Sequence, residues 1–246
     1  QTLLSRLEEY AIWAASTPTL RGTVPDQQQR HPLGLSGGGL ADAVRLLQAG
    51  AQVQGGEGYI ADALSDAIGM IDWALDLGAE ARAQSPISPA VPSGQLVLSF
   101  DDRFMGEAWR RIAAYECSEG ALYVLAALAL AVSSPPPLFL AIDDFDHALN
   151  PRLARALVER FCDWVTKHSW GRPERQVLIT THNPLILDGL DLTDDRIRLF
   201  AVERTSKGRT VAERVLVDDR LLARAKEGWT LSRLWVMGEI GGVPNV

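Results

Sequence analysis

The sequence predicts an α/β fold in which a mostly parallel sheet is flanked by helices. Residues 138–142 are continuously apolar, which is the pattern of a central parallel strand covered on both faces, and residues 177–181 form the next predicted strand. A segment with apolar residues at helical spacing, 151–164, lies between them, and strands that alternate with helices are typical of a parallel sheet. The chain has 246 residues, 47% hydrophobic and 22% charged, which fits a globule with a sizeable core.

The first third of the chain predicts mainly helices. Residues 3–15, 40–49 and 60–83 carry apolar side chains at helical spacing, and 16–39 is an irregular connector rich in Pro, Gln and Gly. Three prolines in 85–93 indicate a boundary. We therefore predict two units: a helical arm or insert with its connector over residues 1–84, and a second lobe over residues 85–246.

The second unit alternates between strands and helices. It closes with a segment, 229–244, that combines two tryptophans with a glycine-rich tail, and we expect its apolar residues to pack on this domain or on a partner subunit. The remaining predicted elements are a strand at 95–100, a buried helix at 118–132, a strand at 138–142, a helix at 151–164, a strand at 177–181 and a hairpin formed by 198–204 and 211–217.

Composition limits the classes of partner. The net charge of −7 and the pI near 5.1 argue against a basic nucleic-acid surface over the whole chain, so any such contact would be local. Cys117 and Cys162 have no metal-binding spacing, and we expect a reducing, cytoplasmic location. The longest apolar run, 121–132, is too short to span a bilayer, and the amino end has no secretory signal, so no membrane partner is expected.

The most informative segment joins the strand 138–142 to two adjacent carboxylates. In nucleotide hydrolases, a carboxylate at a strand end orients the Mg²⁺ shell and a second acid polarises the attacking water. Asp143 and Asp144 have the positions for these two roles. The alternative is a buried strand that happens to end in solvated acids.

Two other segments lie in the order that such a hydrolase requires. Ser118-Glu119-Gly120 opens the helix upstream, where a hydroxyl and helix N–H groups can bind a phosphate, although Ser118 could simply cap the helix. Downstream, His182 ends a strand in the segment Thr-Thr-His-Asn-Pro, and its alternative role is structural. Asp146, His147 and Asn150 follow the paired acids and could equally cap the helix at Pro151.

Together these segments resemble the second half of an ABC-class ATPase head, as found in SMC-like and overcoming-lysogenisation-defect-like proteins and in bacterial AAA-family defence ATPases. The resemblance implies a P-loop NTPase-type sheet with an inserted helical subdomain, and ATP and Mg²⁺ as ligands. The sequence departs from the family at Cys117, where Leu is usual, and at Asp144, where Glu is usual. By resemblance, the implied roles are metal binding by Asp143, catalysis by Asp144 and His182, and nucleotide binding by Ser118, Glu119, Gly120, Asp146 and Asn150.

The first half of such a head is missing. A phosphate loop has the pattern GxxxxGK[ST], and none of the three lysines, Lys167, Lys207 and Lys226, follows a glycine-rich turn. We expect this Walker A segment on residues before Gln1. The alternative is a polypeptide that does not hold a nucleotide by itself.

The resemblance implies an ATPase that forms a homodimer around two ATP molecules, because the signature-type segment binds the partner protomer's nucleotide. We expect it to control a separate effector subunit, a nuclease or toxin, in anti-phage defence, with DNA or RNA as a further candidate partner. Two alternatives remain open: a nucleotide-gated scaffold with little hydrolysis, and a repair ATPase that binds DNA ends.

Overall fold

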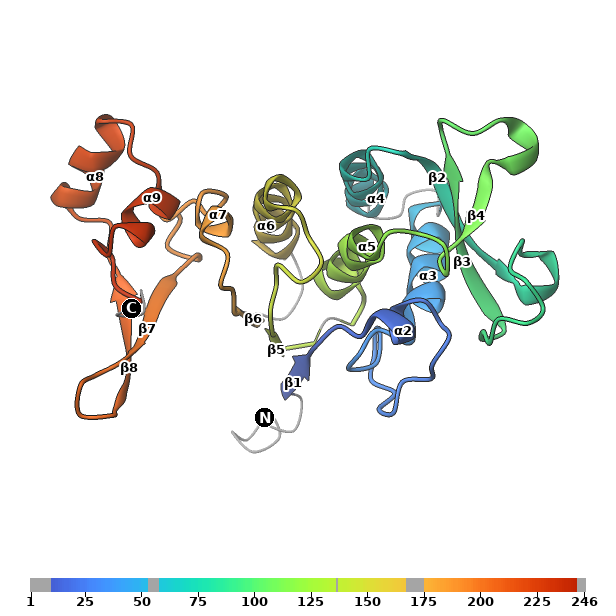
Figure 1. The fold of residues 1–246 in the computed structure, drawn as a ribbon, viewed down its shortest axis with the longest axis horizontal. Coiled ribbons are helices and arrows are strands. Elements are labelled where there is room, and N and C mark those ends of the chain that lie inside the picture. Colours follow the sequence, from blue (N-terminus) through green and yellow to red (C-terminus); the bar gives the residue numbers. More distant parts are fainter. Residues whose placement is uncertain (1–9, 53–57, 136, 167–174, 243–246) are drawn as a thin grey trace.

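The structure is a computed structural model that describes residues 10–52, 58–135, 137–166 and 175–242. Helices and strands alternate through most of it (Figure 1). The strands are β1 (Tyr10–Trp13), β2 (Ala74–Ala81), β3 (Leu96–Asp102), β4 (Arg111–Ala113), β5 (Phe139–Ile142), β6 (Gln176–Ile179), β7 (Leu199–Arg204) and β8 (Thr210–Val215). The α-helices are α2 (Thr17–Leu20), α3 (Leu40–Ala51), α4 (Gly58–Met70), α5 (Glu119–Val132), α6 (Pro151–Thr166), α7 (Pro184–Leu187), α8 (Asp219–Lys226) and α9 (Leu231–Val236).

The central sheet is parallel, with the strand order β1-β5-β6. Its core face packs under α5 and α6, as Figure 1 shows. Trp13 of β1 lies on this face with its ring 5.4 Å from that of Tyr123 in α5, and Leu140 and Ile142 of β5 are buried beside it. The predicted α/β fold with a parallel sheet and flanking helices is therefore confirmed.

The opposite face of this sheet is open within the described residues. The aligned side chains of Ile12 and Leu178, on either side of Ala141, are 55% and 57% exposed. The expectation that helices cover both faces is therefore not met by the part of the chain that the structure describes. Helices there cover one face only, and the apolar side chains of Ile12 and Leu178 stay exposed on the other.

Helix α5 lies at the centre of the molecule and is apolar on all sides. Every residue from Ala121 to Val132 is buried, because α5 lies between the central sheet and the helices α3, α4 and α6. A helix that is apolar all round requires such complete coverage. The prediction of a buried helix over 118–132 is confirmed, and Ser118 is its N-cap.

Two helical predictions in the first third were wrong. The segment predicted as a helix over 3–15 contains β1 at Tyr10–Trp13, with residues 1–9 outside the described part. The helix predicted over 60–83 ends at Met70, and β2 follows, paired antiparallel with β3, which in turn pairs with β4. In both places pairing with another strand, β5 for the first segment and β3 for the second, overrides the local helical spacing. The predicted boundary at residue 84 stays a prediction, and the β2–β3 pairing crosses it.

The C-terminal part consists of α7, the hairpin β7–β8, α8 and α9. The predicted hairpin is confirmed, with Leu199 opposite Val215 and Arg204 opposite Thr210. Helix α9 is fixed to the end of α7: the Ser232 amide donates to Asp188 Oδ1 at 2.8 Å and its hydroxyl donates to Oδ2 at 2.7 Å. Within the described ranges, none of the helices has both the length and the apolar character of a membrane span.

Candidate functional site

The candidate site lies where β5 and β6 end side by side. These strands are parallel and in register, so the residues that follow them leave the sheet at the same edge. The Thr180 hydroxyl donates to Asp143 Oδ1 at 2.6 Å and accepts from the Asp144 amide at 3.0 Å. The Phe145 amide donates to the Thr180 carbonyl at 2.8 Å. One threonine therefore joins the strand that ends in the paired acids to the strand that leads to His182.

Asp144 has a special backbone conformation. Its φ of +55° lies in the left-handed region, which among residues other than glycine is adopted mostly by Asn and Asp. The chain turns sharply here, and the carboxyl groups of Asp143 and Asp144 both lie on exposed residues. This conformation gives a physical reason for Asp at this position.

Tyr123 contacts the candidate site from helix α5. Its ring is fully buried in α5, and its hydroxyl donates to the Asp144 carbonyl at 3.4 Å. Burial, followed by the negative charges of Asp146, Asp144 and Asp143, raises the pKa of Tyr123 well above its ordinary value, so the phenol stays neutral and remains a donor. The sequence analysis missed this role. Tyr123 is nevertheless the one hydroxyl-bearing side chain in the apolar run 121–132, which is the signal that could have revealed it.

The loop after the paired acids connects three elements. The Thr181 hydroxyl donates to Asp146 Oδ1 at 2.6 Å, which forms a second hydroxyl–carboxylate link between the ends of β5 and β6. On its other side, His147 Nε2 lies 3.2 Å from Glu119 Oε1 in the first turn of α5. The predicted residues Glu119, Asp146 and His147 are thus brought together.

The start of α5 approaches this loop closely. A Cβ atom added to Gly120 would lie 3.1 Å from the backbone carbonyl oxygen of Ala148, so a larger residue would press on the loop. Ser118 Oγ accepts from the Ala121 amide at 3.4 Å, and Asn150 Oδ1 accepts from the Leu153 amide at 3.0 Å. Both side chains therefore cap helices, as the alternative interpretations stated, and their roles toward a nucleotide stay predictions.

His182 follows the second threonine and is exposed. Among the described residues it has no hydrogen-bond partner, while its neighbour Asn183 caps α7 by accepting from the Leu185 amide at 3.0 Å. The structure thus brings the paired acids to the strand end that carries His182. Ser118 lies at the start of α5, and that helix is joined to the segment of the acids by the contact of Glu119 with His147 and by the hydrogen bond from Tyr123 to the Asp144 carbonyl.

The oxygen ligands that the site offers suit Mg²⁺ bound together with a phosphate rather than a metal ion held by protein side chains alone. No group of three or more His, Cys, Asp or Glu side chains able to hold a metal occurs in the part of the chain that the structure describes. Mg²⁺ usually keeps several waters and takes one or two carboxylates plus phosphate oxygens. The exposed Asp143 carboxylate, fixed by Thr180, fits that requirement.

Comparison with known proteins finds a family profile that matches the part of the chain holding the site. Residues 106–188 match the profile of the family described as "AAA domain, putative AbiEii toxin, Type IV TA system". Every residue predicted for the site lies in this segment. No curated protein matches the chain.

Three solved structures of SMC heads resemble the chain. The SMC head domain from Thermotoga maritima is 18% identical with a TM-score of 0.38, over 72% of this chain and 52% of that one. The Smc head with an extended coiled coil from Pyrococcus furiosus, bound to the C-terminal domain of ScpA, is 14% identical with a TM-score of 0.37, over 70% and 39%. An SmcHead bound to the C-winged helix domain of ScpA is 10% identical with a TM-score of 0.44, over 85% and 57%. The chain thus spans about half the length of these proteins.

Proposed function

We propose that this chain, whose residues 106–188 match an AAA-domain profile, belongs to an ATPase of the SMC-like ABC class and supplies the hydrolytic half of an ATP-hydrolysing site. The observation that carries the proposal is the hydrogen-bonded joint between the ends of β5 and β6. There, Thr180 fixes Asp143 and the Asp144 amide, and His182 lies two residues further on.

The proposed roles follow from this geometry. Asp143, held in one orientation by Thr180, would bind the Mg²⁺ shell. That ion, when bound, neutralises charge on the phosphates. Asp144 would accept a proton from the attacking water, and its exposed position leaves room for that water. His182, exposed and without a described partner, would contact the γ-phosphate.

A phosphate loop has to reach this site from outside residues 1–246. Such a loop follows a strand and opens a helix. The sheet has space for both: β6 ends the order β1-β5-β6 within the described residues, and the face with Ile12 and Leu178 is open. A parallel strand beside β6 would bring its following loop to the edge that holds Asp143 and Thr180. Its helix would cover the open apolar face.

We further propose that two such heads dimerise around ATP through Ser118, Glu119 and Gly120. The start of α5 is suited to this role because Ser118 is exposed, as an interface residue in the separated protomer must be. Through His147, Glu119 would also connect a nucleotide bound there to the loop after Asp144. The matched family is described as an AAA domain and putative toxin of a type IV toxin–antitoxin system. We propose on this basis that the ATPase acts together with an effector, in defence.

ATP turnover of the native protein tests the proposal. We expect Asp143→Ala and His182→Ala to lower kcat by about 100-fold or more, the size of a lost acid–base or metal contact. The control is Asp195→Ala, which removes an exposed carboxylate outside the site and should leave turnover unchanged. Turnover of Asp143→Ala within about threefold of the wild type would contradict the assigned role. A wild-type protein without turnover would favour the nucleotide-gated scaffold.

A further inference from the structure

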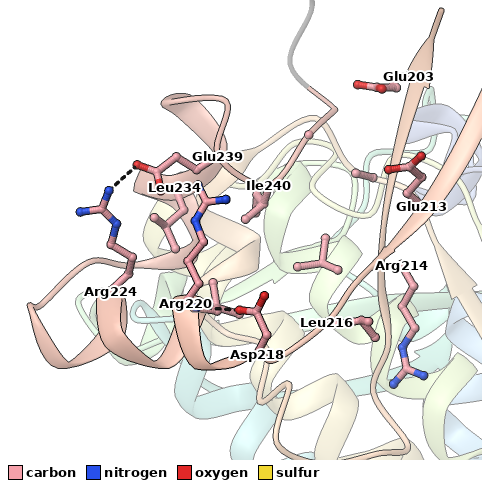
Figure 2. Close-up of a pocket in the computed structure, with 14 residues that line it drawn as sticks. Glu203, Glu213, Arg214, Leu216, Asp218, Arg220, Arg224, Leu234, Glu239 and Ile240 are labelled. Carbon is pink, nitrogen blue, oxygen red and sulfur yellow. Dashed lines mark hydrogen bonds and ion pairs between the residues drawn. The ribbon is translucent and has the colours of Figure 1, made fainter.

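The hairpin β7–β8 separates two kinds of surface. Successive side chains of a strand point to opposite faces. One face, with Ala201, Glu203, Glu213 and Val215, turns toward α8 and α9 and lines a cavity of about 300 Å³ (Figure 2). Leu221 and Leu234 close that cavity from the helices, so this inner face anchors the hairpin to the C-terminal helices.

The outer face is apolar along its middle and basic at its ends. Cross-strand pairs on this face are Phe200 with Arg214, Val202 with Ala212, and Arg204 with Thr210. Phe200 and Val202 are 49% and 58% exposed, although β-branched and aromatic residues on a strand usually pack against a neighbour. Arg214 also borders the cavity, but Figure 2 shows its side chain extending away from Glu213, its neighbour on the same strand.

Charge is distributed unequally between the two faces. Arg204, Lys207, Arg209 and Arg214 lie on the outer face or in the turn, are exposed, and have no ion pair among the described residues. Three arginines near the hairpin are paired with acids instead: Arg196 with Asp194, and Arg220 and Arg224 with Glu239. The two acids of the hairpin, Glu203 and Glu213, line the cavity on the other side. Four uncompensated cations therefore lie together on a chain whose net charge is −7.

We infer that the outer face of the β7–β8 hairpin binds single-stranded nucleic acid. An exposed aromatic ring on a strand offers a stacking surface for an unpaired base, and flanking cations follow the phosphate backbone. Arg214 lies opposite Phe200, and Arg204 lies four residues further along β7, about 14 Å away at a rise of ~3.4 Å per residue. The backbone would thus meet a cation at either end of the apolar strip, with a base stacked on Phe200 beside Arg214.

An unpaired strand fits this surface better than a duplex or an acidic protein. In a duplex the bases are already stacked on one another, so Phe200 would have no free base face. An acidic protein would form ion pairs with the arginines, but the exposed ring of Phe200 would add no specific contact to them. The inference does not require nucleotide binding at the strand ends of β5 and β6, and it assigns a separate surface.

Fluorescence anisotropy with a labelled 20-nucleotide oligo(dT) tests the inference on the native protein. We expect Phe200→Ala to weaken binding by about tenfold, as loss of one stacked base does. We expect Arg214→Ala to weaken binding and to reduce the slope of log K against log salt by about 0.7, the value for one phosphate on a single strand. Phe104→Ala and Arg45→Ala are matched controls on other exposed elements and should leave binding unchanged.

Three results would overturn the inference. The first is that the wild type does not bind oligo(dT) at 50 mM salt. The second is that the hairpin variants and the control variants lose equal amounts of oligo(dT) affinity. The third is that the protein prefers a 20-base-pair duplex and that Phe200→Ala does not change this binding. ATP turnover measured on the same samples separates this surface from the proposed ATPase site. The hairpin variants should keep wild-type turnover, and their thermal unfolding curves show whether each variant is folded.

Discussion

Replacing Thr180 by Val should separate the two strand ends that form the candidate site. Val has nearly the shape of Thr but no hydroxyl, so the change removes the 2.6 Å bond to Asp143 and the 3.0 Å bond from the Asp144 amide. A hydrogen bond to a charged group contributes about 1.5–3 kcal/mol and a neutral one about 0.5–1.5 kcal/mol. Water can partly replace both hydrogen bonds, because they lie at an exposed edge of the sheet. We therefore expect a loss of about 1–2 kcal/mol in the free energy of unfolding.

Urea denaturation measures this loss, and Thr180→Ser is the matched control because it keeps the hydroxyl. Ser should remain close to the wild type, while Val should unfold at lower urea concentration with an unchanged slope. In the native protein, Val should also lower ATP turnover, since Asp143 would lose its fixed orientation. Equal unfolding free energies for the Val and Ser variants would refute the reasoning that the hydroxyl holds the two strand ends together.

Two further changes test the packing and the buried thiol. In Gly189→Ala, the new Cβ would lie 2.6 Å from the Arg155 carbonyl oxygen, so overpacking of about 1–3 kcal/mol should lower the melting temperature, and an unchanged melting curve would contradict the close contact. Burial raises the pKa of the Cys117 thiol to about 12 from 9.0. Between these pH values the unfolded thiol ionises while the folded one stays protonated, so stability should fall with rising pH by at most about 1.4 kcal/mol per pH unit. Urea unfolding at pH 8 and 10.5 should show a smaller loss in Cys117→Ala than in the wild type, and equal losses would contradict this.

The parts of the fold that depend on local pattern could be predicted from sequence. Residues 118–132 are apolar on every side, and 138–142 are continuously apolar, so a buried helix and a central strand follow with little ambiguity. The strand β1 could not be found in this way. Its residues carry apolar side chains at helical spacing, and only the pairing with β5, more than a hundred residues away, makes them a strand. The same holds for β2 and its partner β3.

The candidate site was predictable only as a set of residue types. Asp143, Asp144 and His182 stand out because each follows an apolar strand. The contacts of Thr180 and Tyr123 could not be predicted, because they depend on which strands are neighbours and on which side of α5 faces the sheet. The left-handed backbone at Asp144 is likewise a property of the turn, and the sequence shows only that Asp stands there.

The most direct test of the central claim compares ATP binding with ATP turnover in Asp144→Asn. Asn also tolerates the left-handed backbone, so the substitution removes the proton acceptor without straining the turn. Binding of a fluorescent ATP analogue and single-turnover hydrolysis would be measured on the same native preparation. The account predicts that the analogue binds as in the wild type while hydrolysis falls by about 100-fold or more. Hydrolysis at the wild-type rate would show that Asp144 does not activate the water and would contradict the account.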